Sequence, residues 1–120
     1  MQPTLTFNPI RRLVYINASG LKLLPEADYA LILISSNEKR IIIYPCDANT
    51  RDAVKLRSSG LNISKPRYIR FLDDFGDKLL ELMQWQRDCR YRLQGGLALS
   101  NSDMILSFDL TSAEVFFYVA

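Results

Sequence analysis

The sequence predicts an α+β domain of two β-α-β-hairpin pseudo-repeats that share one core, with a mostly antiparallel sheet and one longer helix. Three observations lead to this prediction. The chain has 120 residues and is 48% hydrophobic, which suits one folded domain with its own core. Short runs rich in β-branched and aromatic residues alternate with polar turns. One segment, residues 71–85, repeats its apolar residues at helical spacing.

The first expected elements are two short strands and a short helix. Residues 4–7 and 12–16 are rich in strand-forming residues. Asn17 is a favourable helix N-cap, and Leu21 belongs to the apolar side of a helix of about two turns. Pro25 ends this helix, because the residue before a proline is displaced from the α region.

A β-hairpin is expected next, with arms at 29–35 and 40–44 around the polar turn 36–39. Both arms are almost continuously apolar, which indicates burial on both faces or contact with a second copy. Residues 47–66 are polar and are expected to form a connector with one helical turn at 53–56.

The second half repeats the order strand, helix, hairpin. Residues 71–85 are expected to form the helix, and the glycine-bearing segment 94–103 the hairpin loop. Strands are expected at 67–70, 89–93, 104–110 and 115–119. This order predicts a single domain over 1–120, with pseudo-repeats at 12–46 and 67–110, a basic connector at 47–66 and a C-terminal strand at 115–119.

The composition excludes several classes of enzyme. The chain has no histidine, so Ser-His-Asp, Cys-His and histidine–metal sites are excluded. Cys46 and Cys89 are 43 positions apart and have no metal-binding spacing. We therefore predict a protein that is not an enzyme and has no cofactor and no metal. The start of the chain lacks a signal-peptide pattern, and the longest apolar run, 29–34, is too short to span a membrane. This predicts a cytoplasmic location without membrane contact.

The charges are segregated along the chain, which the net charge of +2 hides. Residues 51–70 contain six basic residues and one acidic residue, whereas residues 72–81 contain four acidic residues and one basic residue. Tyr68 lies within the basic segment, and aromatic residues among cations suit contact with bases and phosphates. On a strand, Arg90 and Arg92 point to one face, and such a row suits an anionic ligand or an acidic partner.

Residues 12–45 also follow the layout of a known domain. The matching positions are Arg12, Val14 and Ile16 in the first strand, Leu21 and Leu24 in the helix, Ala27-Asp28 at the turn, and Leu31 and Leu33 after it. This first third of the chain resembles the AbrB-like swapped-hairpin domain, although Asn17 replaces the usual proline and Pro25 a common glycine. The resemblance implies a DNA-binding fold that dimerises by interleaving hairpins, with two tandem copies in the MraZ-like branch. It also implies phosphate contacts by Arg11, Arg12 and Lys22.

The whole chain resembles short proteins carried on bacterial mobile genetic elements. The segments behind this resemblance are Ile43-Tyr44-Pro45-Cys46-Asp47, Arg90-Tyr91-Arg92 and Ser107-Phe108-Asp109-Leu110. It implies a biological context and no particular chemistry.

The leading prediction is a non-catalytic nucleic-acid-binding protein, a bacterial or mobile-element transcriptional regulator that binds DNA as a homodimer. Charge alone indicates further candidate contacts with nucleic acid, which are Arg51, Lys55, Arg57, Lys65, Arg67, Arg70, Arg90 and Arg92. The alternative is a small protein inhibitor of a host defence nuclease, of the anti-CRISPR or anti-restriction type. Its binding face would be the acidic helix face of Asp73, Asp74, Asp77 and Glu81. A third hypothesis is a structural assembly module held together by the apolar hairpin 29–44.

Overall fold

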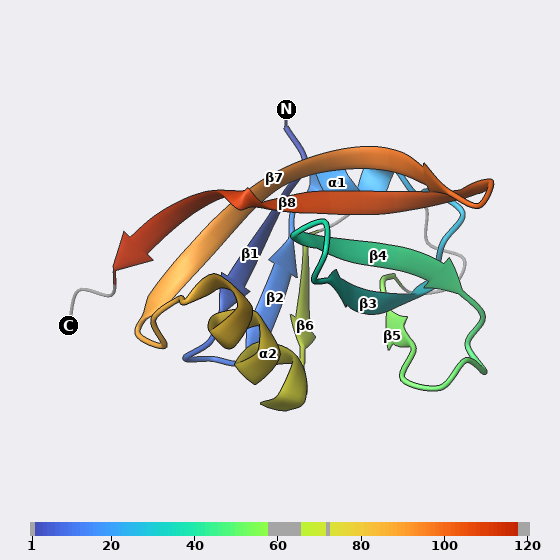
Figure 1. The fold of residues 1–120 in the computed structure, drawn as a ribbon. Coiled ribbons are helices and arrows are strands. Elements are labelled where there is room, and N and C mark those ends of the chain that lie inside the picture. The colour runs from blue at the N-terminus through green and yellow to red at the C-terminus, as the bar shows by residue number, and fades with distance from the viewer. Residues whose placement is uncertain (1, 58–65, 72, 118–120) are drawn as a thin grey trace.

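The computed structural model describes residues 2–57, 66–71 and 73–117, which form one antiparallel sheet and two helices (Figure 1). The strand order in the sheet is β5-β3-β4-β8-β7-β1-β2-β6. The strands are β1 (Thr4–Asn8), β2 (Leu13–Ile16), β3 (Tyr29–Ser35), β4 (Arg40–Cys46), β5 (Val54–Lys55), β6 (Arg67–Arg70), β7 (Cys89–Ser100) and β8 (Asp103–Phe117). The helices are α1 (Ala18–Lys22) and α2 (Asp73–Met83).

The sheet curls into a nearly closed barrel. Its two edge strands, β5 and β6, meet where the Arg67 Nε donates a hydrogen bond of 3.0 Å to the carbonyl oxygen of Lys55. The inward-facing side chains form the core, because successive residues of a strand point to opposite faces. Fully buried members of this core include Leu5, Phe7, Ile16, Ile41, Ile43, Leu93, Leu106 and Phe108.

An aromatic cluster joins α2 to the barrel. Phe7 stacks on Phe71 with ring centroids 5.3 Å apart, and Trp85 stacks on Tyr91 at 4.1 Å. Gly76 permits this packing, because a Cβ at that position would lie 2.5 Å from the Phe71 ring. The apolar face of α2 thereby covers the end of β1 and the start of β7, and its charged face stays exposed.

The short helix α1 is held at both ends by side chains. The Asn17 Oδ1 accepts hydrogen bonds from the N–H groups of Gly20 and Thr4, both at 3.0 Å, which confirms the predicted N-cap. At the other end, the Arg57 guanidinium donates to the carbonyl oxygens of Leu21 and Leu24, both at 2.6 Å. These bonds satisfy carbonyls that the end of a helix leaves without partners.

The predicted α+β class is wrong, because the second half of the chain is dominated by two long strands. Residues 94–103 are not a loop: β7 runs to Ser100 and β8 starts at Asp103. Only Asn101 and Ser102 turn, both with positive φ (49° and 73°), as a two-residue hairpin turn requires. The predicted loop rested on Gly95 and Gly96, but Gly95 serves close strand packing. A Cβ there would overlap the carbonyl oxygen of Ser107 on β8.

Three smaller expectations also need correction. The C-terminal strand 115–119 is not separate, because β8 continues without a break to Phe117, and residues 118 and 119 lie outside the described residues. The helical turn at 53–56 is absent, because Val54–Lys55 forms β5 on the edge of β3. The helix 71–85 is shorter than expected and covers Asp73–Met83.

The strand pairings have a two-fold regularity. The strands β1, β2, β3 and β4 correspond in order to β5, β6, β7 and β8. When each strand is exchanged with its counterpart, the hairpin β3–β4 becomes β7–β8 and the pair β3–β5 becomes β7–β1. The pairs β4–β8 and β2–β6 are unchanged. The exception is that β1 and β2 share a ladder, whereas β5 and β6 meet through the Arg67–Lys55 contact. Duplication of the chain stays a prediction, and this order is the one that duplication would produce.

Candidate nucleic-acid interface

The outer face of β7, β1, β2 and β6 gathers basic and aromatic side chains from distant parts of the chain. The buried residues Phe7, Val14, Ile69 and Tyr91 fix the inner face of these strands. Their neighbours along each strand therefore point outward. The outward-pointing residues are Arg90 and Arg92 on β7, Thr6 and Asn8 on β1, Leu13 and Tyr15 on β2, and Tyr68 and Arg70 on β6.

This face contains a hollow of about 480 Å³. Its lining residues are Thr6, Asn8, Arg11, Leu13, Tyr15, Tyr68 and Arg90. Hydroxyl, amide and guanidinium groups thus surround two aromatic rings. We call this surface the strand groove, and we include in it Arg70 and Arg92, which point outward from the same four strands.

The two tyrosines of the strand groove form a pair. Tyr15 and Tyr68 lie directly opposite each other on β2 and β6, with ring centroids 4.8 Å apart and ring planes inclined by 52°. Tyr68 is 62% exposed, so much of its ring is available to a ligand. An aromatic face held by a neighbouring ring can stack on a nucleobase.

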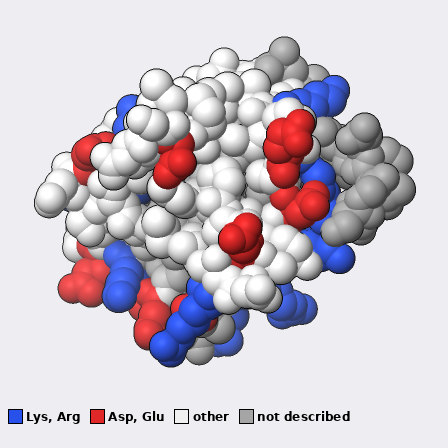
Figure 2. Space-filling view, turned by 90° about the vertical axis from the view of Figure 1, so that its right-hand side faces the viewer, with Lys and Arg blue, Asp and Glu red and all other residues white. Residues whose placement is uncertain are grey.

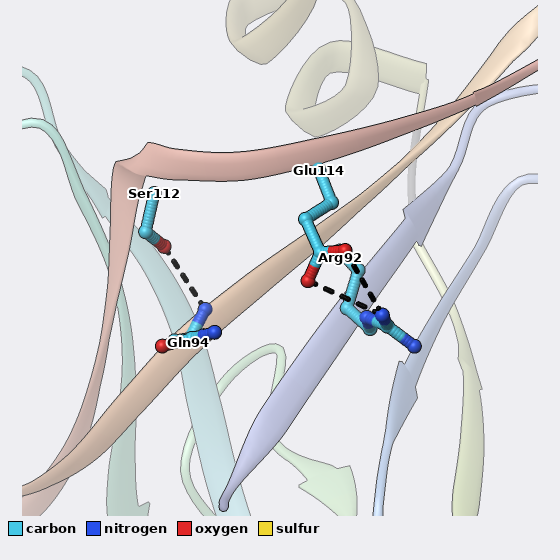
Figure 3. A network of polar contacts seen from close by, with 4 residues as sticks. All are labelled: Arg92, Gln94, Ser112 and Glu114. Carbon is cyan, nitrogen blue, oxygen red and sulfur yellow. Dashed lines mark hydrogen bonds and ion pairs between the residues drawn. The ribbon is translucent and has the colours of Figure 1, made fainter.

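The two arginines of β7 lie beside β8. Arg90 and Arg92 place their guanidinium carbons 5.6 and 4.9 Å from the centroid of the Phe116 ring, within the range of cation–π contact. Arg92 also pairs with Glu114, because one of its terminal nitrogens lies 3.2 and 3.1 Å from the two carboxylate oxygens (Figure 3). This carboxylate reduces the positive charge at one end of the strand groove.

A β-bulge sets the position of Glu114. Arg92 lies opposite Glu114 but Gln94 lies opposite Asp109, so residues 110–113 of β8 face Leu93 alone. The Ser112 hydroxyl accepts a hydrogen bond of 3.0 Å from the Gln94 N–H (Figure 3) and donates one of 2.7 Å to the Asp109 carbonyl oxygen. These bonds replace the ladder that the bulge interrupts.

A carboxylate anchors the same bulge. The Asp109 Oδ1 accepts hydrogen bonds from the Thr111 hydroxyl at 2.7 Å and from the Thr111 N–H at 2.9 Å. These hydrogen bonds, with a smaller contribution from the charge of Arg40, hold the pKa of Asp109 below its usual value. Asp109 is therefore a carboxylate at neutral pH and keeps the bulge closed.

The structure brings some of the sequence-predicted residues together and separates others. Arg11, Arg70, Arg90 and Arg92 belong to the strand groove, and Arg12 lies beside Arg11 in the β1–β2 turn. Others lie elsewhere: Lys22 at the end of α1, Arg51 in the β4–β5 turn, and Lys55 and Arg67 where the sheet edges meet. Arg57 holds α1, and Lys65 lies outside the described residues.

The acidic candidates lie on α2. Asp74, Asp77 and Glu81 are exposed along this helix, and Asp73 is its first residue. The Asp77 Oδ1 forms an ion pair of 2.6 Å with the Arg87 guanidinium, so this carboxylate already has a partner within the chain.

Sequence reasoning missed Tyr15, Thr6 and Asn8. The alternation of Val14 and Ile16, both fully buried, is the local signal that Tyr15 points outward. No local signal pairs β2 with β6, whose facing residues Tyr15 and Tyr68 are far apart along the chain.

In the described part of the chain, no group of three or more acidic, cysteine or histidine residues is placed to hold a metal ion. Cys46 and Cys89 are free thiols. Of the two described helices, neither is long and apolar enough to cross a membrane. No protein-family model, curated protein or solved structure matches this chain, so the AbrB-like resemblance stays a prediction.

Proposed function

We propose that this protein binds single-stranded nucleic acid, without catalysing a reaction on it, through the strand groove. One observation carries the proposal: the fold collects Arg11, Arg70, Arg90 and Arg92 around the Tyr15–Tyr68 pair on a single outer face. These residues come from three separate strands, β2, β6 and β7, and from the β1–β2 turn. Arginine neutralises phosphates and releases their counterions, and tyrosine rings stack on bases.

The tyrosines favour a single strand over a duplex. Inside a duplex each base is already stacked on its neighbours, so the exposed ring of Tyr68 reaches a base face only where the base is unpaired. The strand groove is also a hollow in a sheet surface and presents no helix to a major groove. A chain of phosphates passing along the arginines, with one base on Tyr68, satisfies both features.

We keep within this proposal the wider prediction that the protein is a transcriptional regulator. A bacterial or mobile-element transcriptional regulator in the cytoplasm would also bind duplex DNA at a target site. The test therefore compares single-stranded DNA with duplex DNA.

The direct test is fluorescence anisotropy of labelled single-stranded and duplex DNA at roughly 50 and 200 mM salt. For single strands, log K falls by about 0.7 per phosphate for each tenfold rise in salt. Three or four arginine–phosphate contacts thus predict a loss of affinity of about 20- to 50-fold between these two conditions. Absence of binding at the lower salt concentration would overturn the proposal.

Charge reversals separate the strand groove from the net charge. The double variant Arg90→Glu/Arg92→Glu should abolish binding. The double variant Lys22→Glu/Arg51→Glu makes the same change in net charge at two exposed positions outside the groove, and should retain most of it. Equal losses from the two variants would show that binding depends on net charge and not on the groove.

Tyr68 tests the stacking contact. Tyr68→Ala should weaken binding to single strands by about 1–3 kcal/mol, which is roughly 5- to 150-fold. Tyr68→Phe keeps the ring and should bind like the wild type. Because Tyr68 is 62% exposed, both variants should fold. An unchanged affinity of Tyr68→Ala would contradict stacking.

The acidic face of α2 distinguishes the nuclease-inhibitor alternative. Asp74→Lys/Glu81→Lys reverses two exposed charges on this helix. A nucleic-acid binder should keep or increase its affinity after this change. An inhibitor that uses this face should lose its effect on the nuclease.

A further inference from the structure

Among the described residues, the second half of β7 is an open sheet edge. The pairing of β7 with β1 covers Tyr91–Gln94, and the last contacts on this side are at Gly95. Its N–H donates to the Pro3 carbonyl oxygen at 3.2 Å, and its carbonyl oxygen accepts from the Gln2 Nε2 at 3.3 Å. From residue 96 to residue 100, the only strand beside β7 among the described residues is β8. Figure 1 shows β7 continuing past the end of β1, with β8 beside it. An edge of this kind offers its backbone N–H and C=O groups to another strand.

The open edge is apolar and carries no charge. Leu97 is 42% exposed, Leu99 71% and Met104, opposite Leu99, 46%. Residues 95–102 contain neither a charged residue nor a proline. Figure 2 views the molecule from the side to which the tip of the β7–β8 hairpin points in Figure 1, and shows Lys and Arg mostly toward the margins and a largely uncharged middle with separate acidic groups.

The other two sheet edges are protected. Lys55 lies on β5, and Arg67 and Arg70 lie on β6. Charged side chains on edge strands normally prevent pairing with other chains, and the end of β7 lacks this protection.

We propose that a second copy of this chain covers the open edge, by antiparallel pairing of the two β7 strands about a two-fold axis at Ala98. In this register Leu97 of each copy lies opposite Leu99 of the other copy, and Gly96 of each copy lies opposite Ser100 of the other. The sequence is complementary to itself here: the leucines meet on one face, and only small residues lie on the other. A contact that uses the same surface on both copies closes as a dimer.

The backbone orientation fits this register. The Gly95 N–H points away from β8, toward β1. The pairing with β8 is regular from Gln94 to Ser100, so the N–H and C=O groups of Leu97 and Leu99 point the same way. In the proposed dimer these two residues exchange hydrogen bonds, and Ala98 faces itself in the closer, non-hydrogen-bonded type of pair.

The first test measures mass by sedimentation over a concentration series. The wild type should form a dimer, and Leu99→Lys should raise the dissociation constant by roughly tenfold or more, because it places a charge in the apolar contact. Leu97→Glu/Leu99→Lys should restore the dimer, since the two-fold axis sets position 97 of one copy against position 99 of the other. Phe117→Lys changes an apolar side chain that is 68% exposed at the other end of β8, and should leave the dimer intact.

The second test traps the register. In a Cys46→Ser background, Ala98→Cys should form a disulfide-linked dimer on mild oxidation, since non-hydrogen-bonded partners lie about 4.5 Å apart between Cα atoms. Ser100→Cys should not, because its partner is Gly96. A monomeric wild type, a dimer lost only in Phe117→Lys, or cross-linking at position 100 and not at 98 would each overturn the proposal.

Discussion

Removing the carboxylate of Glu114 should strengthen the binding of nucleic acid. Glu114 holds Arg92 through contacts of 3.1 and 3.2 Å, and the two side chains are 50% and 43% exposed. Ion pairs at this exposure are worth about 0.2–1 kcal/mol, so releasing Arg92 for a phosphate should increase affinity roughly 1.5- to 5-fold. Glu114→Gln keeps the size of the side chain and an acceptor oxygen, and removes the charge.

The salt dependence identifies the cause of such a gain. One additional phosphate contact should steepen the slope of log K against log salt by about 0.7 for single-stranded DNA, as measured by anisotropy at several salt concentrations. Glu81→Gln makes the same change in net charge on the exposed face of α2 and should leave the slope unchanged. The reasoning is refuted if Glu114→Gln alters neither affinity nor slope, or if Glu81→Gln gives the same gain.

Three further predictions concern the β7–β8 hairpin and the thiols. Gly95→Ala should destabilise the fold by roughly 1–3 kcal/mol in urea unfolding, because the new Cβ overlaps the backbone of β8, whereas Gly96→Ala, with open space around it, should be nearly neutral. The pKa of Asp109 is lowered in the folded protein from its ordinary value of about 4. The stability that this carboxylate adds is therefore complete above that ordinary pKa and is lost as the pH falls through the lowered pKa. The stability advantage of the wild type over Asp109→Asn should disappear in acid. A thiol-specific disulfide reagent should modify half-buried Cys46 in the folded protein. It should modify Cys89 only after unfolding, because this thiol is buried and its burial raises its pKa. Equal rates of modification of the two thiols in the folded protein would contradict this prediction.

The first half of the fold could be predicted because its signals are local. The hairpin Tyr29–Ser35 and Arg40–Cys46 follows from two apolar runs around a polar turn, and the start of α1 follows from Asn17. Each of these elements depends on residues close together in the sequence. Local propensity and turn chemistry are sufficient there.

The second half could not be predicted in the same way, because non-local packing decides it. Gly95 and Gly96 read as a loop, yet they lie in β7, where the approach of β8 leaves no room for a side chain at the first of them. The bulge between Arg92 and Gln94 then lets β8 continue where a strand break was expected. Neither feature has a signature apart from the partner strand.

The candidate site was predictable only in its parts. Alternation placed Arg90 and Arg92 on one face of a strand, and the structure places both on the outer face of β7. Their proximity to Tyr68 depends on the order β7-β1-β2-β6, which joins segments from both halves of the chain. Charge along the sequence could not separate Arg70, in the strand groove, from Arg57, which holds α1.

The two proposals meet on one strand and can be tested together. Arg92 lies six positions before Ala98, so at about 3.4 Å per residue the two Arg92 side chains of a dimer would be at most about 40 Å apart. Since Leu97 and Leu99 of the two copies meet on the same face, the two-fold axis is perpendicular to the sheet, and both strand grooves face the same side. A short oligonucleotide then reaches one groove, and a long one spans both. Leu99→Lys should therefore bind short single strands like the wild type, but should lose about 100-fold or more in affinity for long ones. Equal loss for both lengths would show that the substitution damages the strand groove itself.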